Sequence, residues 1–329
     1  MEFLHAYGLF LAKTLTLLVA VLALILLLLK QTKSSKPSPG GESSIRVDHL
    51  NREFEQAALK LKAAMLSGKA DRSERKALVK QQRSGPDSSR RRLYVIDFEG
   101  DLRASSVAAL RDEVTAILTA AGDDDEVLLR LESPGGVVHG YGLAASQLLR
   151  IRDRGLRLTV AVDKVAASGG YLMACVGQQI LAAPFAIIGS IGVVAQIPNF
   201  NRLLKRHDIE FEQFTAGKHK RTVTLFGKNT PAGREKLQRE IEDVHGLFKE
   251  FIAENRPQVD VEEVATGEYW YGARALEHKL VDELRTSDDY LLEASKDTEI
   301  FRVHSARPKS WLTRLISQTN EAWSQLSGR

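Results

Sequence analysis

The sequence predicts an α/β fold in which the strands pair in parallel. Three apolar stretches typical of strands cover residues 93–100, 126–133 and 156–163, and segments 105–120 and 140–152 have the amphipathic pattern of helices. Parallel strands need a long crossover connection, which is usually a helix. The alternation of strands and helices therefore favours a parallel sheet with helices packed on it.

A further apolar region, residues 178–197, is long enough to be mistaken for a membrane span. Pro184, Gly189 and Gly192 interrupt it, which favours two short strands buried in the core. Beyond this region, a long helix is expected up to about Asn255. Its start is marked by Thr230, which can cap the helix, and by a proline in the first turn.

The first thirty residues predict a membrane anchor. The apolar run extends from Tyr7 to Leu29 and is interrupted only by Lys13. At about 1.5 Å per residue, a run of this length crosses a hydrocarbon core of roughly 30 Å. A cleaved signal peptide is the alternative, but no small-residue cleavage site follows the apolar core. We therefore expect a retained, single-pass anchor.

The segments around the main domain have little apolar content. Residues 30–44 are rich in proline, glycine and serine, as in a linker, and residues 49–82 have helical propensity and dense charge. The second segment is a stalk, a partner-docking helix or a plain solvated helix. The predicted organisation is an anchor (1–30), a linker with a charged helical segment (31–90), the main domain (91–306) and a C-terminal amphipathic helix (307–329).

The C-terminal segment has an apolar face that leaves three locations open. Trp311, Leu315, Trp323 and Leu326 fall near one side of the expected helix. Such a face docks on a neighbouring subunit, lies on a membrane surface or packs on its own domain.

Composition argues against several classes of site. The single cysteine, Cys175, cannot form an internal disulfide or a cysteine-rich zinc site, and its apolar context is typical of a core residue. The eight histidines form no metal-ligand motif, so no metal is expected. The net charge of +4 is small and the basic residues are scattered, so nucleic-acid binding has no support.

Two glycine turns follow successive strands and are candidates for one site. One is Pro134-Gly135-Gly136, and the other is Ser168-Gly169-Gly170 at an expected strand–helix corner. Ligands of parallel sheets gather at the carboxyl ends of the strands. Glycine turns there can present backbone N–H groups to an oxyanion, and the corner can expose a serine nucleophile. A tight turn used only for packing is the alternative for each.

A serine nucleophile needs a base, and the sequence leaves several candidates. His139 lies near the first glycine turn, and His219 lies in a basic stretch, but neither has a marked carboxylate partner. A lysine acts as a base at neutral pH only where burial lowers its pKa from about 10.4 by about three units. Residues 214–227 contain no Asp or Glu, and either Lys218 or Lys220 fits there. An exposed basic loop is the alternative.

Four motifs in order resemble a known peptidase family. LESPGG, KVAASGGY, APFAIIGSIGVV and TAGKHKRT are similar to the motifs of the signal peptide peptidase A family of serine–lysine peptidases. The N-terminal anchor, the charged segment and SPGGVVHGYGLAASQL resemble its SohB-type inner-membrane members. The resemblance covers nearly the whole chain.

The resemblance implies a role for five residues. Ser168 matches the nucleophile, Lys220 the general base, and Ser190 the hydroxyl that orients the lysine amine. Gly136 and the amide of Gly169 match the oxyanion hole. No cofactor is implied.

The resemblance also implies a fold, an assembly and a location. The family has a Clp/crotonase-like α/β fold and forms rings or domes of like subunits, in which neighbouring subunits share active sites. Its substrates are remnant signal peptides and other membrane-associated polypeptides. Its catalytic part lies outside the cytoplasm, in the periplasm. The distribution of positive charge in this sequence disagrees with a periplasmic location. Lys30, Lys33 and Lys36 follow the predicted span and favour a cytoplasmic C-terminal side.

The sequence therefore predicts a membrane-anchored serine endopeptidase that acts on peptides or proteins. Two other classes remain open. A crotonase-like acyl-CoA enzyme uses similar glycine turns without a serine–lysine pair, and a non-catalytic membrane scaffold keeps the fold for assembly alone.

Overall fold

The computed structural model describes residues 8, 13–16, 44–65, 89–217 and 220–306. One compact unit extends from Ile45 to Ser305. Most of the predicted anchor and the whole C-terminal amphipathic helix (307–329) lie outside the described residues. Within the described part of the chain, no helix combines the length and the apolar character that crossing a membrane requires.

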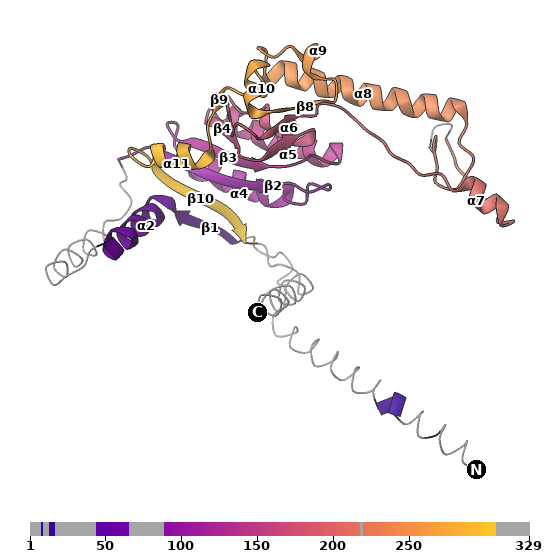
Figure 1. Cartoon of the computed structure of the whole chain (residues 1–329), viewed down its shortest axis with the longest axis horizontal. Coiled ribbons are helices and arrows are strands. Elements are labelled where there is room, and N and C mark those ends of the chain that lie inside the picture. The colour runs from indigo at the N-terminus through magenta and orange to yellow at the C-terminus, as the bar shows by residue number, and fades with distance from the viewer. Residues whose placement is uncertain (1–7, 9–12, 17–43, 66–88, 218–219, 307–329) are drawn as a thin grey trace. The chain divides into compact units, whose positions relative to one another are not determined.

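The centre of the unit is a seven-stranded sheet in the order β1-β10-β2-β3-β4-β6-β9 (Figure 1). The pairs from β10 to β9 are all parallel. The predicted strands and the α/β architecture are thus confirmed. The strands are β1 (Ser44–His49), β2 (Arg92–Glu99), β3 (Glu126–Glu132), β4 (Arg157–Val162), β6 (Gln179–Ala182), β9 (Glu283–Leu284) and β10 (Glu299–Ala306).

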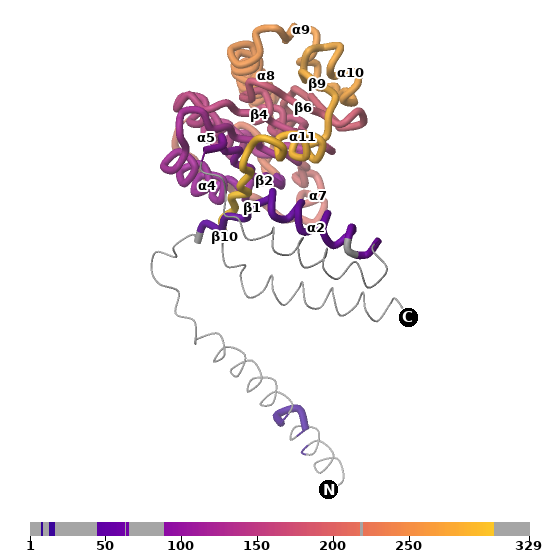
Figure 2. The backbone as a smooth tube through the Cα atoms, turned by 90° about the vertical axis from the view of Figure 1, so that its left-hand side faces the viewer, coloured from indigo at the N-terminus to yellow at the C-terminus, as the bar shows by residue number. Residues whose placement is uncertain are grey.

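Both faces of this sheet are covered, which is why its strands read as nearly continuous apolar runs. Along β2, Tyr94, Ile96 and Phe98 face one core cluster, and Leu93 and Val95 face a second. The larger cluster lies under α4 (Val107–Ala120) and α5 (Val138–Asp153), which pack side by side (Figure 2). The smaller lies under α2 (Leu50–Met65) and α11 (Ser287–Ala294).

The first two elements of the unit come from the segment that the sequence analysis treats as linker and charged helix. The strand β1 lies at the edge of the main sheet beside β10. At the start of α2, Leu50 is buried and Phe54 packs against the smaller core cluster, whereas Leu61 and Met65 are exposed. Only the first turns of α2 therefore belong to the core.

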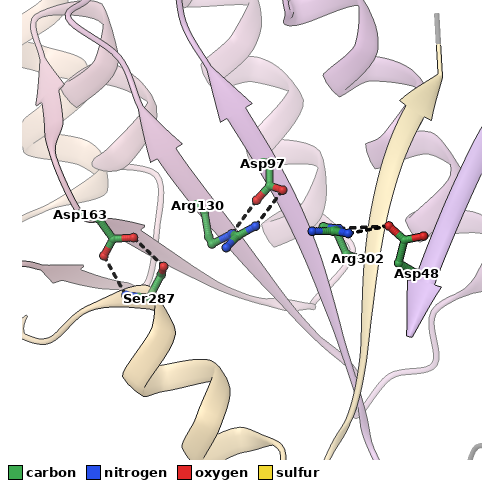
Figure 3. A network of polar contacts seen from close by, with 6 residues as sticks. All are labelled: Asp48, Asp97, Arg130, Asp163, Ser287 and Arg302. Carbon is green, nitrogen blue, oxygen red and sulfur yellow. Dashed lines mark hydrogen bonds and ion pairs between the residues drawn. The ribbon is translucent and has the colours of Figure 1, made fainter. Parts of the chain in front are cut away.

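Polar pairs tie the strands together where the second cluster ends (Figure 3). Arg302 of β10 binds Asp48 of β1 at 2.7 Å, and Arg130 of β3 binds Asp97 of β2 through two hydrogen bonds of 2.6 and 2.8 Å. These side chains share the sheet face with Val95, Leu128 and Ile300, because alternate strand residues point the same way. The two pairs therefore lie on the same sheet face as the second core cluster, in the part of that face that is partly exposed to water.

A second, three-stranded sheet lies at the carboxyl end of the first. In it β5 (Val165–Ala167) pairs in parallel with β7 (Ile187–Gly189), which pairs antiparallel with β8 (Tyr269–Tyr271). Pro184 falls between β6 and β7, so the long apolar region is two buried strands, as predicted. The helix α6 (Gly169–Ala174) follows β5 directly.

A segment that we call the arm, residues 199–217 and 220–229, lies away from both sheets at the amino end of α8 (Figure 1). Its contacts are largely its own: Asn199 binds carbonyls of Thr224 and Gly227, and the ring of Phe226 lies near those of Phe200 and Phe211. The long helix α8 (Pro231–Asn255) is capped by Thr230 as predicted. The remaining helices are α7 (Asn201–Arg206), α9 (Val261–Val264) and α10 (Gly272–Glu277).

Candidate active site

Ser168 lies at the corner between β5 and α6 in a strained backbone conformation. Its φ is 52° and its ψ is −119°, a combination that costs a non-glycine residue of the order of 1–3 kcal/mol. The Ser168 amide donates to the Gly189 carbonyl at 2.7 Å, and its own carbonyl accepts from Leu172 at 3.0 Å. Backbone bonds on both sides therefore hold the hydroxyl at the tip of the corner.

The turn after β3 packs directly against this corner. Ser133 pairs with Ala166 of β5, and the Ala167 amide donates to the Ser133 carbonyl at 3.0 Å. A Cβ placed on Gly135 would lie 2.8 Å from both the Ser168 Cβ and the Gly169 nitrogen. Only glycine fits there, and the two predicted glycine turns do meet.

Two backbone amides at this junction are available to a ligand. Gly169 is the first residue of α6, where an amide has no acceptor within the helix. Within residues 89–217 and 220–306, neither its N–H nor that of Gly136 donates to a protein acceptor. Both glycines line the same cavity as Ser168, and N–H groups without a protein acceptor are the kind of donor that an oxyanion hole uses.

Ser190 follows β7 and, like Ser168, has a positive φ, 49°. Its amide donates to the Glu268 carbonyl at 2.7 Å, which ties it to the chain before β8. Ser190 lines the same cavity as Ser168, Gly136 and Gly169. Four of the five residues that the resemblance singles out are therefore gathered at one site.

The cavity has a volume of about 1210 Å³ and mostly apolar walls. Its walls come from the loop after β2, from α5 and α6, and from α8. Among its lining residues, only Tyr141 and His245 carry titratable side chains. The apolar lining residues include Leu102, Val137, Val138, Leu172, Val193, Val194, Val244, Leu247, Phe248 and Phe251.

The histidine at the cavity is neither of the two histidines that the sequence suggests as a base. His139 is exposed and is not a lining residue, and His219 lies outside the described residues. His245, on α8, lines the cavity, and its buried Nε2 has no hydrogen-bond partner within the described chain. Local sequence offers no signal for it, because a histidine on an amphipathic helix has the pattern of a surface residue.

Lys220 is the residue that the structure does not bring to the cavity. It lies on the arm, its side chain is exposed, and it is not among the residues lining the cavity. Its amide donates to Gly217 at 3.1 Å, within the arm. The buried surroundings that a lysine base needs are absent around Lys220 within the described part of one chain. Lys218 lies outside that part.

The single cysteine, Cys175, is not among the residues that line the cavity. Cys175 is buried in α6's C-terminal turn, and burial raises the pKa of its thiol to about 12. Among the described residues, no group of three or more His, Cys, Asp and Glu side chains is placed to hold a metal ion.

A serine and paired glycine amides around an apolar cavity, at the carboxyl end of parallel strands, are typical of α/β enzymes that transfer or hydrolyse acyl groups. Comparison with known families is more specific. Residues 2–148 match the N-terminal model of peptidase family S49, and residues 150–300 match the model of peptidase family S49 itself. The chain belongs to peptidase family S49.

Curated relatives place it among the SohB-type members. A probable protease SohB of Haemophilus influenzae is 45% identical, with 98% of this chain and 94% of the relative aligned. A probable protease SohB of Buchnera aphidicola from Acyrthosiphon pisum is 54% identical over 72% of this chain and 71% of the relative. Among solved structures, the 1510-N membrane-bound stomatin-specific protease with a substrate peptide aligns at 14% identity and a TM-score of 0.43, covering 71% of this chain and 99% of that one.

Proposed function

We propose that this peptidase is a serine endopeptidase in which Ser168 is the nucleophile and Lys220 the general base. In this proposal Ser190 orients the lysine amine, and the amides of Gly136 and Gly169 stabilise the oxyanion. The observation that carries it is the strained corner at Ser168 with two unpaired amides beside it, all on one cavity.

The chemistry follows from these groups. The neutral amine of Lys220 accepts the Ser168 proton while Oγ attacks the peptide carbonyl carbon, and the carbonyl oxygen becomes an oxyanion held by the two amides. Collapse of this intermediate breaks the C–N bond, and the lysine returns the proton to the leaving amine. Water, deprotonated by the same amine, then hydrolyses the acyl-enzyme and regenerates Ser168.

Lys220 reaches the serine, we infer, from a neighbouring copy of the chain. The exposed position of Lys220 on the arm supports this, since a base shared between copies need not approach its own cavity. The arm also exposes large apolar side chains, among them Phe214, which is 90% exposed, and Leu203. Packing of such side chains on a second copy removes them from water and buries the lysine.

The substrate and the location are part of the same proposal. The apolar cavity walls suit an extended, apolar polypeptide such as a remnant signal peptide. The sequence of residues 7–29 supports an inner-membrane anchor, which would hold the catalytic unit near membrane-associated substrates. Following the family resemblance, we place that unit on the periplasmic side. A reporter fused after Arg329 tests this orientation.

Labelling by a serine-reactive fluorophosphonate tests the nucleophile and the base. We expect the full-length protein to be labelled, and Ser168→Ala and Lys220→Ala to lose labelling with unchanged oligomer size. Lys218→Ala is the matched control, since it removes a neighbouring lysine of the same segment, and it should label normally. Full labelling of Lys220→Ala would show that another group, such as His245, activates the serine.

Mixing the two inactive variants tests whether neighbouring copies share the site. Chains with Ser168→Ala and chains with Lys220→Ala, co-expressed in equal amounts, form some sites with an intact serine from one copy and an intact lysine from the next. Random assembly then restores about one quarter of the wild-type activity. No recovery in co-assembled oligomers would contradict a shared site and would require both groups to come from one chain.

A further inference from the structure

A buried chain of hydrogen bonds lies behind the glycine turn that carries the Gly136 amide. Ser133 and Tyr141 are both 0% exposed. The Ser133 Oγ lies 2.7 Å from the Tyr141 hydroxyl, which donates to the Asp101 carbonyl at 2.8 Å. At the other end, the Gly135 amide donates to the Ser133 Oγ at 3.1 Å. Four groups are thus joined in one line.

The direction of this chain is fixed by its protons. The Tyr141 hydroxyl has one proton, and the Asp101 carbonyl, which can only accept, takes it. The bond between Tyr141 and Ser133 must then use the serine proton, which leaves the Ser133 lone pairs to accept from the Gly135 amide. Burial raises the pKa of Tyr141, so its hydroxyl keeps its proton at neutral pH.

Two members of the chain, Gly135 and Tyr141, contact the proposed oxyanion hole. Gly135 lies against the Ser168 Cβ and the Gly169 nitrogen, where an added Cβ would come within 2.8 Å of each. The ring of Tyr141 lies against Gly169, where an added Cβ would be 2.4 Å from the ring Cγ. Tyr141 therefore contacts Gly169 through its ring, and its hydroxyl is linked through Ser133 to the turn that carries the Gly136 amide.

The loop after β2 packs closely against Ser133 and Tyr141. A Cβ on Gly100 would lie 2.4 Å from the Ser133 Oγ and 2.5 Å from the Tyr141 hydroxyl. The same loop also holds the far side of the turn, because the Val137 amide donates to the Leu102 carbonyl at 2.9 Å. Both hydroxyls thus lie buried between the loop after β2 and the turn after β3.

We propose that Ser133 and Tyr141 are positioning residues that set the separation of the Gly136 and Gly169 amides. The inference rests on the proposed function, because an oxyanion hole matters only if the serine attacks a carbonyl. Removing the Tyr141 hydroxyl leaves the ring on Gly169 but takes away the acceptor of the Ser133 proton, so the Ser133 Oγ is no longer held in place against the Gly135 amide. Since these amides act on the transition state more than on bound substrate, the loss should fall on kcat.

The test compares Tyr141→Phe and Ser133→Ala in the full-length protein, with a quenched fluorescent peptide of leucine and alanine. We expect kcat to fall about tenfold in each variant while KM stays within about twofold. A peptide aldehyde, whose adduct carries the oxyanion, should bind weaker by about the same factor as the fall in kcat. The double variant should lose no more than either single one, because both act through one chain.

Tyr171→Phe is the matched control. Tyr171 is equally buried, and its hydroxyl donates to the Leu280 carbonyl at 2.9 Å, away from the glycine turn. Loss of the Tyr171 hydroxyl should lower the stability of the protein about as much as loss of the Tyr141 hydroxyl, and it should leave kcat unchanged. Wild-type kcat in both Tyr141→Phe and Ser133→Ala, or an equal fall in kcat in Tyr171→Phe, overturns the inference. Failure of the proposed function gives a different result from failure of this inference. In that case the wild-type protein itself shows no cleavage that depends on Ser168.

Discussion

Ser168 and Ser190 are connected through a single peptide group. The Ser168 amide donates to the carbonyl of Gly189 at 2.7 Å, and Gly189 directly precedes Ser190. Both serines have a positive φ, 52° and 49°. The relative position of the two hydroxyls is therefore set by backbone geometry that few residues tolerate, as is common at sites where strain serves function.

Strain at Ser168 predicts that, of two variants without the hydroxyl, the glycine variant is more stable than the alanine variant. Both should be inactive. Glycine adopts the observed φ of 52° without a Cβ clash, so Ser168→Gly should be more stable than Ser168→Ala by about 1 kcal/mol. The expected rise in Tm is about 2 °C, measured by thermal denaturation of the two inactive variants. An equal or lower Tm for the glycine variant would show that the corner is not strained.

Gly169 should tolerate no side chain. A Cβ there would lie 2.4 Å from the buried Tyr141 ring, so Gly169→Ala must push the ring or the corner apart, at a cost of about 1–3 kcal/mol. We also expect activity to fall at least about 100-fold, because the displaced amide is an oxyanion donor in the proposed mechanism.

Gly246→Ala is the control for this substitution. Gly246 lies inside α8 with nothing within 4 Å of an added Cβ, so alanine should stabilise the protein by about 0.5–1 kcal/mol and leave activity intact. Comparable losses in the two variants would point to general intolerance of alanine. Urea denaturation and peptide cleavage measure the two effects.

The thiol of Cys175 should be unreactive in the folded protein. Burial raises its pKa to about 12, and the reactive species is the thiolate, which is scarce far below that pH. At pH 8 we expect Ellman's reagent to modify no thiol in the native protein and one per chain after guanidinium is added. Loss of activity on brief treatment with iodoacetamide would contradict this expectation.

The strands that bury both faces are the part of the fold that sequence predicts well. The runs at 126–132 and 157–162 are apolar over most of their length because helices cover both sides of the sheet. The edge strand β1 has no such signal. Its place depends on β10, more than 200 residues later in the chain, through contacts such as Asp48 with Arg302. Local pattern cannot report pairings of that kind.

The residues of the candidate site also differ in how well local sequence predicts them. Ser168, Gly136 and Gly169 lie in turns that directly follow strands, so local sequence places them at the same edge of the fold. Lys220 lies on an arm whose contacts are mostly internal, so local sequence does not indicate what its amine faces. Our proposal is that a second copy of the chain provides those surroundings. Ser133 and Tyr141 have no motif of their own, because the role that we propose for them depends on a buried contact between two different elements.

The bond between Asp48 and Arg302 predicts how the edge of the sheet responds to acid. The hydrogen bond from the guanidinium of Arg302, aided by nearby positive charges, lowers the pKa of Asp48 below its usual value of 3.8. Because the folded-state pKa is the lower one, this pair's contribution is complete above the unfolded-state pKa and is lost as the pH falls through the folded-state value.

Hydrogen exchange of the β1 amides between pH 6 and pH 3 measures this response, after correction for the intrinsic pH dependence of exchange. We expect protection of β1 to fall in this range in the wild-type protein. Asp48→Asn should have low protection at every pH, because its side chain carries no charge for Arg302 to bind. Arg302→Gln should lower protection at least as far as Asp48→Asn, because it also removes the ion pair of Arg302 with Glu53 at 3.6 Å. The double variant should add little to Arg302→Gln, since the hydrogen bonds between the two side chains are already lost. If Asp48→Asn kept the wild-type profile, another group would have to hold β1 on β10, and the contact with Arg302 would be incidental to the edge of the sheet.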